Sequence, residues 1–151
     1  MRLDRRWWIA IGVVVVVAIA VVASNTFFNR TPEECKPVQA FLEFNKSQGD
    51  LIDSKASDSD PAVPTVAEDA VYQQWADGLA QRAQEISDPD LAATAIQVAH
   101  SASQFVAMLP RMRVEAEQHK QGTPAPPVYF EMTMLNKRIT DGLTELADAC
   151  D

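Results

Sequence analysis

The chain has 151 residues, of which 47% are hydrophobic, and its 13 basic and 21 acidic side chains give a formal net charge of −8. This length allows one domain, or one small domain with an anchor, and the net negative charge disfavours a nucleic-acid-binding protein. With two Cys and two His, the chain also offers few ligands for a zinc site.

The first predicted element is a membrane anchor. Residues 7–23 are all apolar and residues 7–28 carry no charge. As a helix, residues 7–28 would be about 33 Å long, which is enough to cross the hydrocarbon core of a bilayer. A single segment in lipid must satisfy its own backbone hydrogen bonds, so we expect residues 7–28 to form a transmembrane helix.

The residues before the anchor predict its orientation. Residues 1–6 contain three arginines, and positive charge is retained on the cytoplasmic side of a membrane. We therefore expect residues 1–6 to be a cytoplasmic tail and residues 29–151 to be an extracytoplasmic domain at the cell membrane. The alternative is a secreted protein whose signal peptide is cleaved near residues 21–23, although signal peptides usually have only 7–15 apolar residues.

The sequence predicts four helices in residues 29–151. Thr31, Pro32 and Glu34 are typical of a helix start with a capping box, and Pro37 predicts that the helix restarts there. Apolar and small residues then follow at helical spacing up to the end of this first helix: Val38, Phe41, Leu42, Asn45, Gly49, Ile52 and Ala56.

The second predicted helix follows a loop at residues 57–64. Thr65 and Glu68 form another capping box, and the inward stripe of this helix is Val71, Trp75, Leu79, Ala83 and Ile86. A short turn then leads into the third helix, with Asp88 as its N-cap and Pro89 as its first residue. Helices joined by so short a turn run antiparallel.

The third predicted helix has the clearest pattern, because its apolar positions advance in steps of four and three residues like the core positions of a heptad repeat. These positions are Leu91, Ala95, Val98, Ala102, Phe105, Leu109, Met112 and Ala116. Pro110 lies beside them on the outer side, where it bends the helix without burying a polar group. Residues 121–127 break the pattern. The inward residues expected in the fourth helix are Phe130, Met134 or Leu135, Ile139, Leu143 and Leu146.

This topology predicts a disulfide. In an up-down-up-down bundle, the first helix begins at the end where the fourth helix stops, and Cys35 and Cys150 stand at those two positions. Exported domains permit disulfides, and closing so long a loop stabilises a fold by about 4–5 kcal/mol in the chain-entropy model. We therefore expect an all-α fold: an N-terminal transmembrane helix followed by an antiparallel up-down four-helix bundle closed by this disulfide.

The sequence offers no catalytic constellation. Hydrolysis requires a nucleophile, a base and an orienting group, but one His, His100, is expected on a solvated face and the other, His119, at the end of a helix. Glu115 is the only acid suitably spaced from His119. Arg111 and Arg113 are expected to form salt bridges with the acidic surface, and the alternative is that they bind a ligand anion. We therefore expect no enzymatic activity, no metal and no cofactor.

The loops at residues 57–64 and 121–127 predict a surface for a partner. Both are rich in proline, both are expected at the membrane-distal tip of the bundle, and stiff apolar loops lose little entropy on binding. The alternative is that they are ordinary connections. The candidate contact residues are Val63, Pro64, Pro126, Pro127 and Tyr129.

The short Arg-rich head, the Val-rich anchor and the Ala- and Gln-rich helical domain between Cys35 and Cys150 resemble the small uncharacterised single-pass envelope proteins of actinobacteria, mycobacteria in particular. The resemblance implies a cell-envelope setting. We therefore predict a membrane-anchored, extracytoplasmic accessory or interaction protein of a cell-envelope complex, with a protein partner. The alternatives are an extracytoplasmic module that binds a lipid or small molecule between its helices, and the secreted helical protein that signal cleavage would give.

Overall fold

The computed structural model describes residues 33–56, 63–120 and 122–150. Within these ranges the chain is all-α, without strands, as predicted. The elements are the 3-10 helix η1 (Glu33–Cys35), α2 (Lys36–Ala56), the 3-10 helix η2 (Val66–Glu68), α3 (Asp69–Ala83), α4 (Pro89–Gln118) and α5 (Pro127–Ala149). The predicted tail and anchor lie outside the described residues. No helix within the described ranges is long and apolar enough to cross a membrane.

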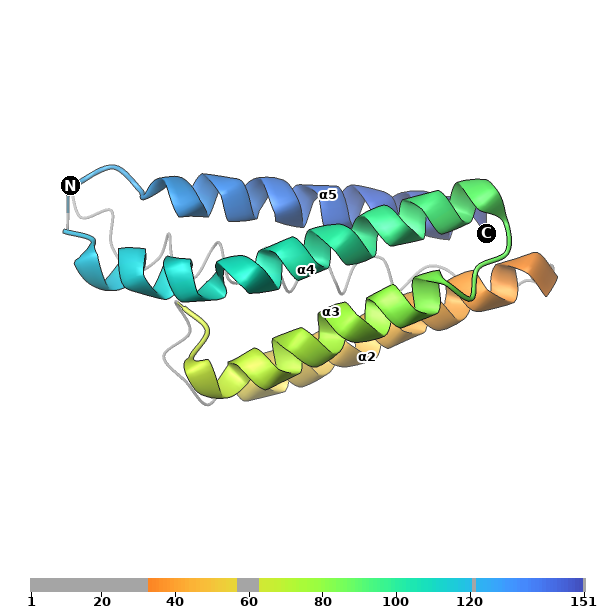
Figure 1. The fold of residues 1–151 in the computed structure, drawn as a ribbon, viewed down its shortest axis with the longest axis horizontal. Helices are drawn as coiled ribbons and strands as arrows, with labels where there is room; N and C mark the ends of the chain where they lie inside the picture. The colour runs from red at the N-terminus through yellow and green to blue at the C-terminus, as the bar shows by residue number, and fades with distance from the viewer. Residues whose placement is uncertain (1–32, 57–62, 121, 151) are drawn as a thin grey trace.

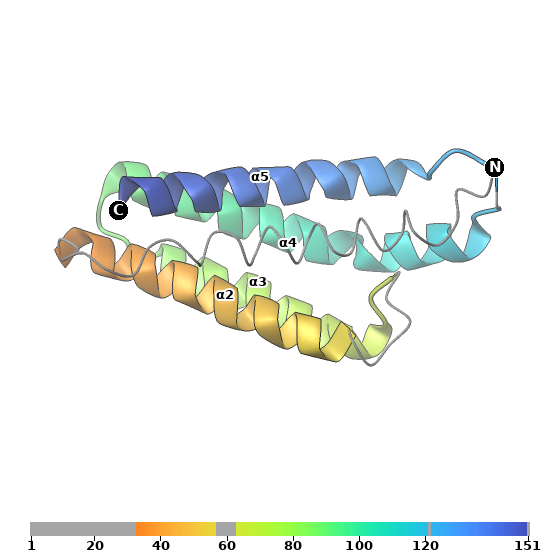
Figure 2. The same cartoon turned by 180° about the vertical axis from the view of Figure 1, so that it is seen from behind.

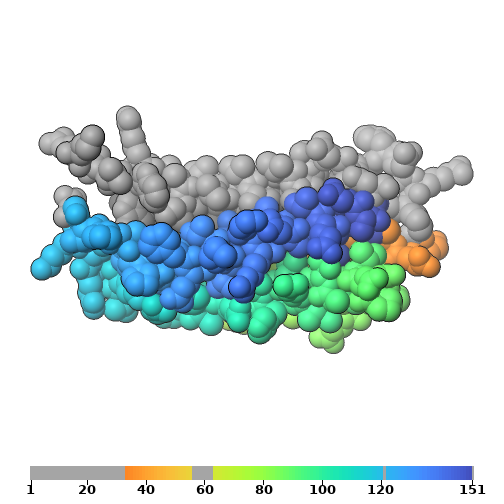
Figure 3. All heavy atoms as spheres, turned by 90° about the horizontal axis from the view of Figure 1, so that it is seen from above, coloured from red at the N-terminus to blue at the C-terminus, as the bar shows by residue number. Residues whose placement is uncertain are grey.

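The four α-helices form two antiparallel hairpins, α2 with α3 and α4 with α5 (Figures 1 and 2). The longest helix, α4, packs along both α3 and α5, whereas α2 packs mainly on α3 and touches α5 much less. The start of α2 lies beside the end of α5 at one end of the elongated molecule (Figure 3), and we call this the disulfide end. The opposite end, where α3 and α5 begin, is the loop end.

Side-chain caps explain where two of the helical segments begin. The carboxylate of Asp88 accepts hydrogen bonds from the backbone N–H groups of Asp90 and Leu91, both at 3.0 Å. Asp88 is therefore the N-cap of α4, as predicted. The carboxylate of Glu68 accepts hydrogen bonds from both the backbone N–H and the hydroxyl of Thr65. This second predicted start is also confirmed.

Pro37 in α2 and Pro110 in α4 both occupy positions that tolerate a proline. Pro37 is the second residue of α2, where a missing backbone N–H breaks no helical hydrogen bond. This position explains why the α-helix starts afresh after η1. Pro110 lies inside α4, which is continuous around it, and its side chain is exposed on the outer side, as predicted.

A single apolar core runs along the four helices, and the predicted stripes of the first three supply most of it. The predicted stripe of α5 is wrong at its start. Phe130 and Met134 are 65% and 55% exposed, while Tyr129 and Met132 are buried. Residues three or four positions apart share a face of a helix. Counting back from the buried Leu135 in steps of three gives Met132 and Tyr129, so Phe130 lies off this face and points outward.

Candidate functional site

The described parts of the two predicted partner-binding loops lie at the loop end. Arg113, near the end of α4, donates a hydrogen bond from Nη1 to the backbone oxygen of Pro64 over 3.1 Å, which holds the segment before η2 against α4. Pro126 and Pro127 stand at the start of α5, at the same end of the molecule (Figure 1). Residues 57–62 of the first loop lie outside the described part of the chain.

The five candidate contact residues differ in their exposure. Of the five, Pro127 alone is exposed, whereas Val63, Pro64 and Pro126 are half-buried, and Val63 packs against the core. Tyr129 is 3% exposed, so the expectation that its side chain contributes to an exposed tip is wrong. The third residue of α5 faces the core, on the same side as the other buried residues of that helix.

Other apolar side chains are exposed at or near the loop end. Val66 in η2 is 72% exposed, Phe130 in the first turn of α5 is 65% exposed, and Val114 near the end of α4 is 51% exposed. Val66 follows directly on a capping residue, and caps lie at the surface, so the sequence contained a signal for its exposure. These three exposed apolar residues were not among the predicted contact residues.

Arg113 forms the best-buried ion pair at this end. Its Nη1 and Nη2 atoms donate to the two carboxylate oxygens of Asp69 over 2.7 and 2.8 Å, and the side chains are 16% and 36% exposed, respectively. Hydrogen bonding to Asp69 raises the pKa of Arg113 above its ordinary value, against the lowering effect of desolvation. Such a bidentate pair fixes orientation as well as distance, so Arg113 holds the start of α3 against α4.

Arg111 makes a similar but more exposed connection from α4 to α5. Its Nε donates to Glu115 over 2.6 Å and its Nη1 donates to Glu131 over 3.2 Å. The hydrogen bond to Glu115 is the main cause that raises the pKa of Arg111. Both arginines therefore form the salt bridges that the sequence predicted, and both help to hold the loop end in place.

A shallow depression of about 300 Å³ opens at the end of α4. It is lined by Glu115, Gln118, His119, Lys120, Thr123 and Pro126. The hydroxyl of Thr123 donates to the backbone oxygen of Lys120 over 2.7 Å and lies 3.3 Å from Nδ1 of His119. The described residues hold no group of three or more His, Cys, Asp or Glu side chains able to bind a metal. The polar lining suits a lipid poorly.

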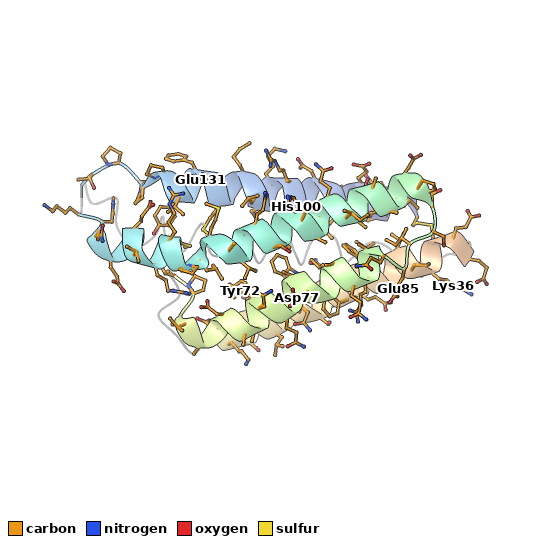
Figure 4. The ribbon with its side chains drawn as sticks, in the orientation of Figure 1. Lys36, Tyr72, Asp77, Glu85, His100 and Glu131 are labelled. Carbon is orange, nitrogen blue, oxygen red and sulfur yellow. A yellow bond between two sulfur atoms is a disulfide. The ribbon has the colours of Figure 1, made fainter. Side chains whose placement is uncertain are left out.

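The remaining predicted positions lie away from this end. His100 is exposed near the middle of α4, as expected, and Figure 4 shows its place on the helix. The Cys35–Cys150 disulfide is confirmed at the disulfide end, with a Cα–Cα distance of 5.6 Å and a sequence separation of 115 residues. Both cysteines are buried.

The chain matches no protein family, no curated protein and no solved structure. At the loop end, Arg111 and Arg113 form ion pairs between helices. Val66, Val114 and Phe130 are exposed at or near the same end. This arrangement suits a rigid contact surface.

Proposed function

We propose that the chain is a non-enzymatic accessory protein of a cell-envelope complex. In this proposal residues 7–28 anchor it in the membrane and the helical bundle lies outside the cytoplasm. One observation carries the proposal: the Cys35–Cys150 disulfide joins the segment that directly follows the predicted anchor to the end of α5. A disulfide also suits an exported domain.

The proposed anchor gives the bundle a direction. The chain enters the bundle at Glu33, beside the disulfide, so the disulfide end faces the membrane and the loop end points away from it. Val66 and Phe130 are then available to a partner. Because the ion pairs of Arg111 and Arg113 hold the helices that carry these side chains, binding requires little further ordering.

Site-specific photocrosslinking in native membranes tests the contact surface. A photoreactive residue would replace Phe130 or Val66 in the full chain, and Glu85 would be the matched control, because it is exposed but lies toward the disulfide end (Figure 4). We expect the same partner protein to be captured from Phe130 and Val66, and little or none from Glu85. Equal capture from all three positions, or none from any, would contradict the proposal.

The orientation and the anchor require a separate test. A reporter enzyme that is active only outside the cytoplasm should be active when fused after residue 151, and the mass of the mature chain should include residues 1–6. A mature chain that lacks its first residues and leaves the membrane would favour the secreted alternative. An inactive reporter would contradict an extracytoplasmic bundle.

The ligand-binding alternative receives less support from the geometry. A module that carries a lipid between its helices needs an apolar cavity of several hundred Å³. The depression at the end of α4 is lined mainly by polar side chains. We therefore base the proposal on protein contact.

A further inference from the structure

The middle part of helix α4 is unusual in its lack of charge. Residues 91–110 contain no Asp, Glu, Lys or Arg, although 23% of the whole chain is charged and about five such residues would be average for this length. Burial explains only the inner face. The outer faces of α2, α3 and α5 all carry charged residues, among them Asp50, Asp77 and Asp141.

The outer face of α4 has a regular pattern of its own. Exposed residues advance in steps of four and three, each five residues after a core position of the same helix and therefore about 140° around it. We call these residues the outer seam: Ile96, His100, Ser103, Ala107, Pro110 and Val114. Ile96 and Val114, at its two ends, are 54% and 51% exposed. In the view of Figure 1, α2 and α5 lie behind α3 and α4, and in the reverse view of Figure 2 they lie in front.

The chemistry of the outer seam suits a second copy of the same chain. Steps of four and three residues are the spacing along which two helices pack in parallel, side chain against side chain. Ser103 and Ala107 are small enough to let two backbones approach. Copies with a net charge of −8 repel one another over most of their surfaces, but this face presents no acidic side chain to its counterpart. The six seam residues also offer no formal charge that would attract a basic or acidic partner, and the neighbouring Arg111 is paired with Glu115 and Glu131.

We propose that the outer seam of α4 packs against the outer seam of a second copy, in parallel, around a two-fold axis along the helices. The parallel direction rests on the proposed function, because two copies anchored in one membrane present their disulfide ends to the same side. In such a pair each seam residue meets its own counterpart. An antiparallel pair would place the two anchors at opposite ends.

The size of the seam sets the expected strength of this contact. From Ile96 to Val114 it is about 27 Å long, and a helix about 10 Å wide would bury about 270 Å² per copy. Stable interfaces bury about 800 Å² per partner. The pair is therefore weak between free chains, and it becomes populated when a shared membrane raises the effective concentration.

Cysteine crosslinking of the full chain in membranes tests the seam. Ser103→Cys or Ala107→Cys would be introduced with the native disulfide retained, followed by mild oxidation and separation without reductant. We expect disulfide-linked dimers in about tenfold higher yield than from Gln97→Cys, because only seam residues come within the distance a disulfide spans. Gln97 is the matched control, since it is exposed on α4 but lies off the seam.

A charge placed on the seam should separate the copies. Ala107→Glu in the Ser103→Cys chain should reduce the dimer yield to that of the Gln97→Cys control, whereas Gln97→Glu in the same chain should leave it unchanged. Ala107 is exposed and Glu favours helices, so the bundle should stay folded, which its circular dichroism checks. Loss of dimer only in the folded Ala107→Glu chain would support the proposal.

Three results would overturn the seam pairing. They are equal dimer yields from Ser103→Cys and Gln97→Cys, no dimer although a maleimide labels the introduced thiol, and crosslinking of the seam to a different protein. The same yield ratio measured on concentrated purified chain separates this proposal from the anchor. If the chain is not anchored in the membrane, the dimer yields of Ser103→Cys and Gln97→Cys in membranes both fall. If the chain is anchored but the seams do not pair, the two yields are equal.

Discussion

The indole nitrogen of Trp75 donates a hydrogen bond to the side-chain oxygen of Asn45 over 2.9 Å, and this bond joins α3 to α2 inside the core. Asn45 is 2% exposed and Trp75 is 3% exposed. The ring of Trp75 also meets Phe105 of α4 edge-on, with 6.4 Å between the ring centres. A buried amide is tolerated when its hydrogen bonds are made, so Asn45 fixes the register of α2 where three helices meet.

Removal of the indole donor should therefore destabilise the bundle. In Trp75→Phe the side-chain oxygen of Asn45 stays buried without this donor, and we expect the free energy of unfolding to fall by about 1–3 kcal/mol. Urea unfolding of the full chain, followed by the helical circular dichroism signal, measures the loss. Gln74→Ala is the control, since this neighbour is exposed and its change should stay within about 0.5 kcal/mol. Equal stability of Trp75→Phe and the wild type would refute the role of the bond.

Gly78 is required by the ring of Phe44. A Cβ atom at position 78 would lie 2.1 Å from Cζ of Phe44, and the guanidinium of Arg82 covers the same ring at 3.7 Å from its centre. Gly78→Ala must displace the ring, so we expect a loss of about 1–3 kcal/mol in unfolding free energy, although alanine favours a helix by about 1 kcal/mol. Thermal unfolding of the single variant checks the direction.

The sign of this effect should reverse when the ring is removed. In a Phe44→Ala chain, Gly78→Ala should increase stability by up to about 1 kcal/mol, because only the helix preference of alanine remains. The four chains of this double-mutant cycle give the coupling between the two positions. A destabilising Gly78→Ala in both backgrounds would mean that another contact requires the glycine.

The described fold was predictable from the sequence where a local capping signal or a long run of regularly spaced apolar residues was present. The core positions of α4, the capping side chain of Asp88 and the pairing of Cys35 with Cys150 all followed from spacing, propensity and topology. The rotation of α5 did not. Apolar residues crowd its first turns on several sides, and its orientation depends on contacts such as Gly142, where an added Cβ would lie 2.5 Å from Val98 of α4.

The loop end shows the same limit. Its position followed from an up-down topology, and the proline-rich loops were found where expected. The exposure of each side chain was not predictable, because Tyr129 is buried by other helices and Phe130, its neighbour, is left outside. Likewise, an acidic partner for Arg113 was expected, but Asp69 lies 44 residues earlier in the sequence and only the packing of α3 on α4 brings them together.

The disulfide should contribute more to stability than any single hydrogen bond. It closes a segment with a sequence separation of 115 residues, and α2 and α5 touch each other less than the other neighbouring α-helices do. In Cys35→Ser/Cys150→Ser the free energy of unfolding should fall by about 2–5 kcal/mol. Backbone hydrogen exchange should rise first in α2. Without the disulfide, this helix is held mainly by its contact with α3 on one side. Unchanged exchange in α2 would show that packing alone holds this helix.

The two tyrosines of the chain predict how stability depends on alkaline pH. Burial raises the pKa of Tyr72 from 10.0 to about 12, with smaller effects of Glu68 and Asp53. Burial likewise raises the pKa of Tyr129 to about 12, with Glu115 acting in the same direction. Because the folded values exceed the unfolded value, the stabilisation is fully present below pH 10.0 and is lost as the pH rises through about 12.

Ultraviolet absorbance of tyrosinate reads both groups directly, since the chain has no other tyrosine. The folded chain should ionise with a midpoint near pH 12 and the urea-unfolded chain near pH 10.0. In Tyr72→Phe, half of the absorbance change should disappear and the loss of stability above pH 10.0 should become smaller. Burial is the main cause that raises the pKa of Tyr72, so a folded-state midpoint near pH 10.0 would mean that water reaches this side chain between α3 and α4.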